Sequence, residues 1–327
     1  MAWLWLFLQR IAAGLLLLVG VLVVNFTLVH LAPGDVADTI AGEMGGADAE
    51  VMAAIRRDYG LDQPFWVQLG RYLAGVAQLD LGHSFFFNRP VLDLILERLP
   101  ATLLLVVSAQ LLAIMAGTLL GVLAARRPNG LLSHLLTTFS LVFYAAPVFW
   151  TGMLLLILFA SVWPLFPVAG MRNIALEGGF WLRTLDILHH LVLPMVTLAT
   201  IYLANYSRLA RASMMEVLEA DYIRTARAKG LGESSVVFKH GLRNAVLPVV
   251  TVAGLQFANV ISGAVLVETV FSWPGLGTLA LDAILGRDAP TLLGILFFSA
   301  LMVVVVNLIT DLSYRLIDPR IRGHGAR

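Results

Sequence analysis

Six long runs without any Lys, Arg, Asp or Glu most constrain what this chain can fold into. Each run can hold a helix of about 20 residues, long enough to cross the roughly 30 Å hydrocarbon core of a bilayer. With 59% hydrophobic and 13% charged residues, a soluble chain would have no interior large enough for this apolar excess. We therefore predict an all-α membrane protein with six transmembrane helices. The runs cover residues 11–31, 100–125, 130–171, 187–207, 245–267 and 290–310.

Two of these runs differ from a simple span. The run 130–171 is too long for one untilted crossing, and Trp163, Pro164 and Pro167 mark the predicted end of its helix at a membrane interface. The first run resembles a secretory signal, but its apolar stretch exceeds the roughly 7–15 residues of a signal core, and no small-residue cleavage pattern clearly follows it. We therefore expect residues 1–31 to hold a retained first helix.

Basic residues are distributed unevenly between the two predicted sides of the membrane. If both termini share one side, that side carries fourteen of the 22 Lys and Arg residues, seven of them between residues 208 and 243. The cytoplasmic side normally has the excess of Lys and Arg. The sequence therefore predicts that both termini are cytoplasmic (N-in/C-in), with a five-helix transmembrane core in residues 100–327.

The long loop 32–99 falls on the external side in this orientation. It carries ten acidic residues and five arginines, and apolar residues recur at helical spacing over 51–59 and over 66–76. We expect an external helical loop of short amphipathic helices, separated near Gly60 and Pro64. Such a loop is either a lid of interfacial helices or a docking surface and gate for a delivered substrate.

The loop 208–247 is a charged island between two apolar runs. Good helix formers over 221–229 stop at Gly230, and a second helix is expected over 234–247, capped by Ser234 or Gly232 and ending before Pro248. A basic loop of this kind could rest on anionic lipid headgroups. The two predicted helices, with acidic residues among the basic ones, favour contact with a soluble partner.

The segments YIRTARAKGL at 222–231 and HGLRNAVLPVVT at 240–251 resemble a known cytoplasmic coupling signature. They are similar to the permease subunits of ATP-binding-cassette importers, specifically the B-type permease of the dipeptide, oligopeptide and nickel family. Positions 224–226 read Arg-Thr-Ala, where the wider importer superfamily has Glu-Ala-Ala, and this variant narrows the resemblance to that family. Further similar segments are LAPGD (31–35), YGLDQPFWVQLGRYL (59–73), LDLGHS (79–84), RPVLDLILERLPAT (89–102), ETVFSWPGLG (268–277) and LIDPRIR (316–322).

The resemblance implies a multi-pass subunit in the inner, cytoplasmic membrane of a bacterium or archaeon. Its implied partners are a homologous second permease, two ATP-binding-cassette ATPase subunits, an external substrate-binding protein and membrane lipid. Di- or oligopeptides are the implied cargo, with nickel chelates, glutathione-like molecules and opines as alternatives within the family. The implied ATPase-coupling residues are Tyr222, Ile223, Arg224, Thr225, Ala226, Arg227, Ala228, Lys229 and Gly230.

This chain is not expected to be an enzyme. It contains no GxxxxGK[ST] phosphate-binding motif, so ATP and Mg²⁺ should act on the partner subunits, and no cofactor is expected on this chain. Zero cysteines exclude disulfides, thiolate metal sites and cysteine nucleophiles, and the net charge of +1 does not suggest nucleic acid. The adjacent His189 and His190 would point about 100° apart on a helix and make a poor metal pair.

Polar residues inside the predicted spans are candidates for a transport pathway. In the fifth span, Gln256, Asn259 and Gly263 lie on one helical stripe, which could face the pathway or the partner permease, or could hold the bundle together by interhelical hydrogen bonds. Glu268 is a single carboxylate near the predicted outer end of that span. We interpret it as an interfacial residue or, with Phe271 and Trp273, as part of an outer gate.

Two other functional classes remain as alternatives. An ion-coupled secondary transporter should show internal repeats, broken helices and several charges inside the membrane. An intramembrane enzyme should show paired carboxylates, a Ser-His pair or an HExxH motif at membrane depth. The predicted spans are free of Lys, Arg, Asp and Glu, and neither set of features is evident.

Overall fold

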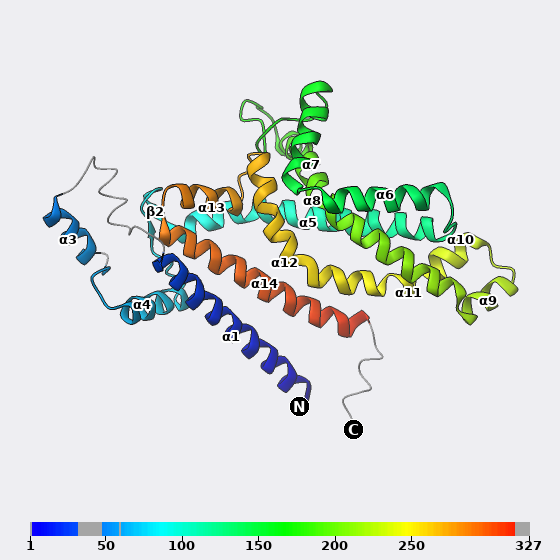
Figure 1. Cartoon of the computed structure of the whole chain (residues 1–327), viewed down its shortest axis with the longest axis horizontal. Coiled ribbons are helices and arrows are strands. Elements are labelled where there is room, and N and C mark those ends of the chain that lie inside the picture. The colour runs from blue at the N-terminus through cyan, green and yellow to red at the C-terminus, as the bar shows by residue number, and fades with distance from the viewer. Residues whose placement is uncertain (1, 32–47, 59, 318–327) are drawn as a thin grey trace. The chain divides into compact units, whose positions relative to one another are not determined.

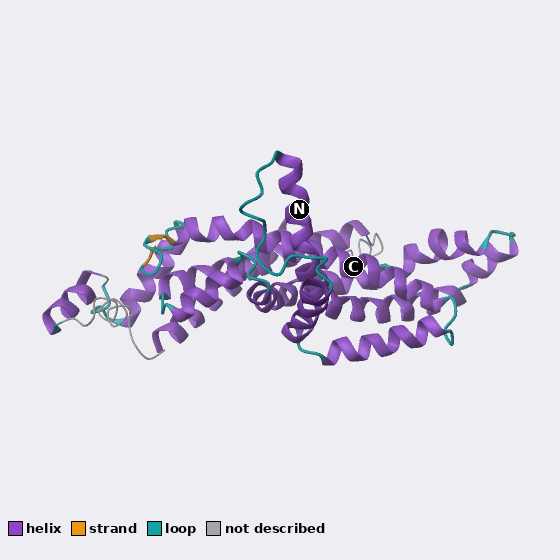
Figure 2. Cartoon of the chain, turned by 90° about the horizontal axis from the view of Figure 1, so that it is seen from above, coloured by secondary structure: helices purple, strands orange, loops and turns teal. Residues whose placement is uncertain are grey.

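The computed structural model describes residues 2–31, 48–58 and 60–317, and most of this part of the chain is helical (Figure 1). Within it, the only strands are β1 (His83–Ser84) and β2 (Arg89–Pro90), which pair antiparallel with His83 opposite Pro90. Figure 2 shows how small this hairpin is beside the helices. The prediction of a predominantly helical membrane protein is confirmed.

Four helices are long and apolar enough to cross a membrane. A fifth, α12, contributes another span if its two halves, Leu247–Phe257 and Asn259–Val270, which are bent by 60° from each other, are taken together. These helices correspond to five of the six predicted spans. They are α1 (Ala2–Leu31), α5 (Val91–Ala125), α8 (Phe180–Glu219), α14 (Ala289–Ile317) and α12 (Leu247–Val270).

The run 130–171, expected as one helix, is broken in the structure. It forms α6 (Leu131–Ala145), α7 (Val148–Leu156) and a turn of π-helix, η1 (Ile157–Val162). Pro147 causes the break, because proline disfavours helical backbone at the residue before it, and Ala146 accordingly has extended angles of φ −79° and ψ 134°. The helical part ends before Trp163, as predicted.

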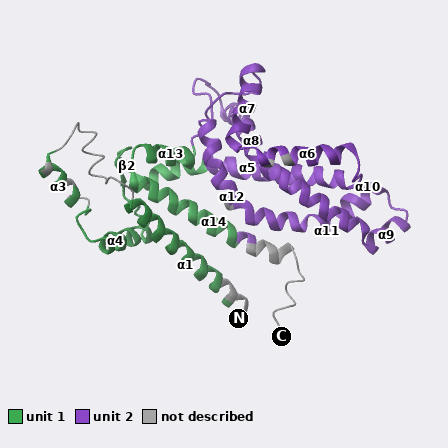
Figure 3. Ribbon diagram, viewed as in Figure 1, with its two compact units in different colours: residues 1–100, 275–308 green, residues 101–274, 309–327 purple. Residues whose placement is uncertain are grey.

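The chain divides into two compact units, shown in Figure 3. The first comprises residues 1–100 and 275–308, and its apolar core draws on α1, α5 and α14 together with two shorter helices, α4 (Phe65–Ala77) and α13 (Leu276–Leu285). The core residues are Leu18, Leu22, Val76, Leu81, Val91, Leu94, Ile95, Leu276, Leu279, Ile295 and Phe297.

Both helical patterns expected in the loop 32–99 are present. They form α3 (Ala49–Asp58) and α4, with Gly60 at φ +64° between them and Pro64 at the N-cap of α4. Residues 32–47 and 59 lie outside the described residues. α5 begins at Val91 and continues through Pro100, so the expected boundary at 99/100 lies inside a helix, and the expected domain division stays a prediction.

A buried carboxylate closes the hairpin onto the start of α14. Asp288 is 1% exposed, accepts a hydrogen bond from the hydroxyl of Ser84, and accepts another from Thr291 Oγ1 at 2.7 Å. The Ser84 hydroxyl in turn accepts the backbone N–H of Phe87 at 2.9 Å. These bonds explain why a polar cluster is tolerated here, because each buried oxygen has a donor.

The second unit, residues 101–274 and 309–327, is organised around α8. The helices α6, α7 and α12 all pack against it, and from His190 to Ser207 none of its residues is exposed. α5 approaches α8 most closely at Gly117 and Gly121, a small-xxx-small spacing that brings helix backbones together in membranes. A Cβ added at Gly121 would lie 2.4 Å from the backbone oxygen of Ser207 and 2.8 Å from Ala210 Cβ.

This close approach makes Gly121 sensitive to the smallest possible substitution. Gly121→Ala should lower the free energy of unfolding by about 1–3 kcal/mol, because the methyl group meets backbone that cannot rotate away. The measurement is thermal unfolding of the purified protein in detergent. Gly20→Ala in α1 is the matched control, since its added Cβ has nothing within 4 Å and should leave the midpoint unchanged or slightly raised. Equal midpoints for the two variants would contradict the packing argument.

Candidate functional site

The helix expected over 221–229 is present as α9 (Asp221–Ala228) and is anchored by two apolar residues. Its role in ATPase coupling stays a prediction. Ile223 is fully buried and Ala226 nearly so, one turn apart, and both pack with Val236. Burial of an isoleucine side chain contributes about 1.5–3 kcal/mol, enough to hold a short helix that would not be stable alone. One face of α9 therefore belongs to the core of this chain.

α9 ends at a glycine, as the sequence predicts. Gly230 adopts φ +75°, and its N–H bonds to the Arg227 carbonyl at 2.9 Å while the Leu231 N–H reaches the Ala226 carbonyl at 3.4 Å. This pair of bonds is a Schellman cap, which requires the left-handed conformation that glycine adopts without strain.

The segment expected as one helix over 234–247 is less regular. It comprises α10 (Glu233–Ser235) with Gly232 as N-cap, the π-helix η2 (Val236–Gly241) and α11 (Leu242–Ala245). Pro248 stands in the first turn of α12, as predicted. Val237 and Ala245 pack with Met214 of α8 and with Val122 and Ala125 of α5, so the loop is seated on both helices.

The charged residues of α9 fall into two groups. Arg227 is paired inside the chain, with its Nη2 2.8 Å from Glu233 Oε1 and its Nε 3.2 Å from Oε2. This bidentate hydrogen bond holds the pKa of Glu233 below its ordinary value, and the positive charge of Arg126 lowers it further. Arg224 has 72% of its side chain exposed and only a long contact of 3.8 Å to the exposed Asp221.

Fewer residues of α9 are available to a partner than the sequence suggests. The hydroxyl of Tyr222 accepts a hydrogen bond from Asn244 Nδ2 at 2.7 Å, which ties the two arms of the loop together. Thr225, Ala228, Lys229 and Gly230 are exposed. Of the basic residues on this helix and its cap, Arg224 and Lys229 are the ones without a strong partner in the described chain.

The three pathway candidates do not share one surface. Asn259 is exposed, while Gln256 and Gly263 are half-buried. Gly263 faces α8, because an added Cβ would lie 3.3 Å from Leu198 Cδ1 and 3.6 Å from the Tyr202 hydroxyl. The bend of α12 between 257 and 259 changes the direction of the stripe that a straight helix would give. A role in transport stays a prediction for all three residues.

The three gate candidates are buried together. Glu268 and Trp273 have no exposed surface and Phe271 has 2%. Thr102 Oγ1 donates to Glu268 Oε1 at 2.6 Å, and Trp273 Nε1 donates to the Ala101 carbonyl at 2.9 Å. This burial is within the protein and leaves the interfacial position of Glu268 in the membrane a prediction. Membership of a gate stays a prediction.

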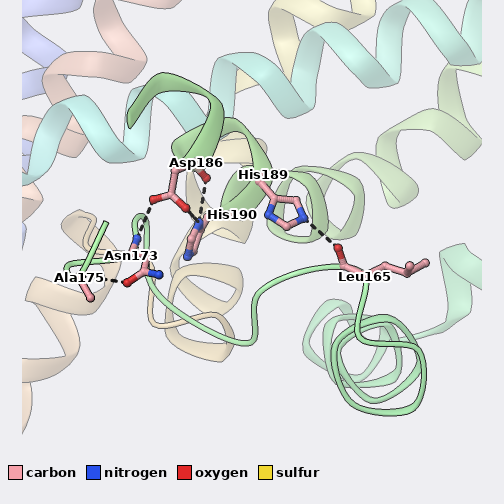
Figure 4. Close-up of polar contacts among 6 residues, drawn as sticks. All are labelled: Leu165, Asn173, Ala175, Asp186, His189 and His190. Carbon is pink, nitrogen blue, oxygen red and sulfur yellow. Dashed lines mark hydrogen bonds and ion pairs between the residues drawn. The ribbon is translucent and has the colours of Figure 1, made fainter. Parts of the chain in front are cut away.

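Besides its bonds to the preceding η1, the loop 163–179 forms three hydrogen bonds to α8 and to Phe271. Gly170 N–H donates to the Phe271 carbonyl at 2.9 Å. Figure 4 shows the other two: Asn173 N–H donates to Asp186 Oδ2 at 2.7 Å, and His189 Nε2 lies 2.8 Å from the Leu165 carbonyl. His189 therefore contacts the loop, while His190 Nδ1 lies 2.8 Å from the Asp186 carbonyl within α8. The described residues contain no group of three or more potential metal ligands.

Comparison with known families now identifies the chain. A family model described as "Binding-protein-dependent transport system inner membrane component" matches residues 117–323, and its N-terminal companion matches residues 3–106. The chain belongs to this family. The resemblance to importer permeases is confirmed, and the family is one of membrane permeases of transport systems, found in the inner membrane.

Curated relatives match the permease over its whole length. The dipeptide transport system permease protein DppB of Escherichia coli K12 is 40% identical over 332 residues, covering 96% of this chain and 98% of the relative. The oligopeptide transport system permease protein AppB of Bacillus subtilis is 40% identical, with the same coverage. The di/tripeptide permease DppB of Pseudomonas aeruginosa is 41% identical, covering 93% of this chain and 94% of the relative.

A solved structure shows the same fold. The inward-facing MetNI methionine ABC transporter aligns with a TM-score of 0.55 and 16% identity, covering 69% of this permease and 96% of that chain. At this identity the comparison supports the fold and nothing about cargo.

The Arg227–Glu233 pair predicts a small, pH-dependent effect on the loop. Because the folded-state pKa of Glu233 is lowered, the pair stabilises the loop above the ordinary carboxyl pKa of about 4.3, and the effect is lost as pH falls through the lowered value. Both side chains are about half exposed, so the contribution is at most about 1 kcal/mol.

Hydrogen exchange at the backbone amides of residues 229–233 measures the stabilisation of the loop by the Arg227–Glu233 pair. Glu233→Gln should exchange up to about fivefold faster than the wild type at pH 7, and the two proteins should converge once the pH has fallen through the lowered pKa of Glu233, after correction for intrinsic rates. A difference that persists unchanged at low pH would show that the ion pair is not its cause.

Proposed function

We propose that this chain is a permease subunit of an ATP-driven importer that passes di- or oligopeptides across the membrane. The observation that carries the proposal is the construction of α9. Its apolar face is held by the chain's own core, while Arg224 and Lys229 on the other side have no strong partner among the described residues. A peptide cargo is supported by the printed names of the full-length relatives.

The assembly would contain a second permease, two ATPase subunits and an external binding protein that delivers the cargo. ATP and Mg²⁺ would act on the ATPase subunits, since this chain has no phosphate-binding motif. Both termini would be cytoplasmic and six spans would cross the membrane. The third span would be formed by α6, α7 and η1 together, since the run 130–171 is not one continuous helix.

The packing of the loop suggests how movement could be passed on. Val237 and Ala245 contact Met214 of α8, and the Cβ of any residue replacing Gly241 would lie 2.5 Å from Met214 Cε. Close-packed interiors transmit displacement with little compression. Movement of a partner bound to α9 would therefore be passed to α8, the helix against which α6, α7 and α12 pack. Rocking of this kind suits alternating access.

Asn259 is the strongest of the pathway candidates. Exposed residues recur along α12 at helical spacing, and half of them are polar: Thr251, Asn259, Ser262 and Thr269, beside Pro248, Leu255, Val265 and Leu266. The exposed side of α5 in the same unit carries only apolar residues: Leu103, Val107, Leu111, Met115 and Leu119. The apolar exposed side of α5 suits contact with lipid. The more polar exposed side of α12 suits a hydrated pathway or contact with a partner permease.

Charge reversal at Arg224 tests the coupling role. Arg224→Glu should reduce ATPase co-purification and transport by roughly tenfold or more, because a like charge would face the acidic groups expected on the partner. Membrane insertion and the unfolding midpoint should not change, since this side chain is exposed. Arg183→Glu, an exposed arginine at the other end of α8, is the control. Normal ATPase recovery and transport in Arg224→Glu would refute the assignment.

Single cysteines test the orientation and the pathway, since the natural chain has none. In the assembled transporter, a membrane-impermeant maleimide applied to intact cells should label Ile174→Cys and not Lys229→Cys. Asn259→Cys should react in at least one nucleotide state, and Val260→Cys, which is fully buried, at most about a tenth as fast. If only lipid-soluble reagents reach Asn259→Cys, that side of α12 faces lipid and the pathway role fails.

A further inference from the structure

Three arginines gather at the turn between α5 and α6, outside the coupling loop 208–247 except for Arg211 of α8. Arg126 and Arg127 directly follow the last residue of α5, and both are exposed. Arg211 comes from α8, and its Nη2 donates to the Pro128 carbonyl at 3.1 Å. The guanidinium of Arg211 therefore lies against the turn that carries the other two. We call Arg126, Arg127 and Arg211 the turn cluster.

The positive charge of the turn cluster is not balanced within the described chain. No carboxylate oxygen of the described residues lies within 4.0 Å of any of the three arginines. Arg126 acts on Glu233 from a distance, but that carboxylate is already engaged by Arg227. Among the described residues, the buried Nε of Arg211 has no hydrogen-bond partner. A buried cationic group without full hydrogen bonding is costly, and a negative charge near the guanidinium would lower that cost.

The start of α6 adds donors at the same place. α6 has 15 residues, and Gly130 at its N-cap supplies no side-chain hydrogen bond. The first helical N–H groups are therefore left for another acceptor, at the positive end of the helix dipole. The Gly130 N–H bonds to the Arg127 carbonyl at 2.9 Å, so this helix start lies directly beside the cluster.

An exposed apolar surface adjoins these donors. Leu131 and Leu135 lie one turn apart on α6 and are 76% and 57% exposed. Because α6 is proposed to lie in the membrane, these leucines would face acyl chains, which brings lipid headgroups within reach of the arginines, whereas a free phosphate ion would contact the arginines alone. A phospholipid uses both, with its phosphodiester at the arginines and an acyl chain along the leucines.

We propose that the turn cluster and the start of α6 bind an anionic phospholipid. The phosphodiester accepts hydrogen bonds from Arg127, Arg211 and the first N–H groups of α6, and the charge of the neighbouring Arg126 adds to the attraction. An acyl chain covers Leu131 and Leu135. The lipid belongs to the cytoplasmic leaflet, a placement that rests on the proposed orientation. It joins the α5–α6 turn to α8, the helix on which the coupling loop is seated.

Native mass spectrometry of the full-length permease, released from mild detergent, tests the site. The probes are phosphatidylglycerol, phosphatidylcholine and inorganic phosphate. Wild type should bind phosphatidylglycerol at least fivefold more tightly than phosphatidylcholine. The double variant Arg126→Gln/Arg127→Gln should lose about fivefold per arginine, roughly 25-fold in total, from the known attraction of a basic residue for an anionic membrane.

The control is Lys239→Gln/Arg243→Gln, which removes the same charge from exposed positions of the coupling loop. It should keep phosphatidylglycerol binding within about twofold of the wild type. Equal binding of the two lipids, equal loss in both double variants, or complete displacement by inorganic phosphate would each overturn the proposal. Because no ATPase is present in this experiment, its outcome is independent of the proposed coupling role.

Discussion

A membrane interior offers no partner for a backbone N–H or C=O, and the architecture of this permease follows from that constraint. Helices satisfy these groups within one segment, which is why α1, α5, α8 and α14 run unbroken for 29 to 40 residues. Lipid is as apolar as leucine, so helix association depends on close approach rather than on the hydrophobic effect. Gly117 and Gly121 supply that approach where α5 meets α8.

In the loop 208–247, apolar burial stabilises the fold, while the exposed charged residues are suited to recognition of a partner. Ile223 and Ala226 hold α9 against the chain, and this apolar contact is worth more than the half-exposed Arg227–Glu233 pair. The pair closes the turn after Gly230 and so is not available to a partner. Arg224 and Lys229 are both exposed. They therefore contribute little to the stability of the fold and are accessible to a partner.

Local signals predicted several elements well. The helical spacing over 51–59 and 66–76 became α3 and α4, and the glycine at 230 became the cap of α9. These elements depend on residues within one or two turns, which sequence patterns report directly. The break at Pro147 was missed because it lies within an uninterrupted apolar run, where a proline inside a membrane helix is also tolerated, as Pro194 is in α8.

The sequence by itself determined the class of protein, the number and position of apolar runs, and the coupling signature, because charge, hydropathy and glycine act locally. Only the tertiary structure decided which of those residues face inward. Glu268 is buried because Thr102, far away in the chain, supplies its donor, and Arg227 is occupied because the turn brings Glu233 beside it. Arg126 and Arg211 are also distant in sequence, and folding places both at one turn. Their like charges repel each other, and an anion bound there would lower this repulsion.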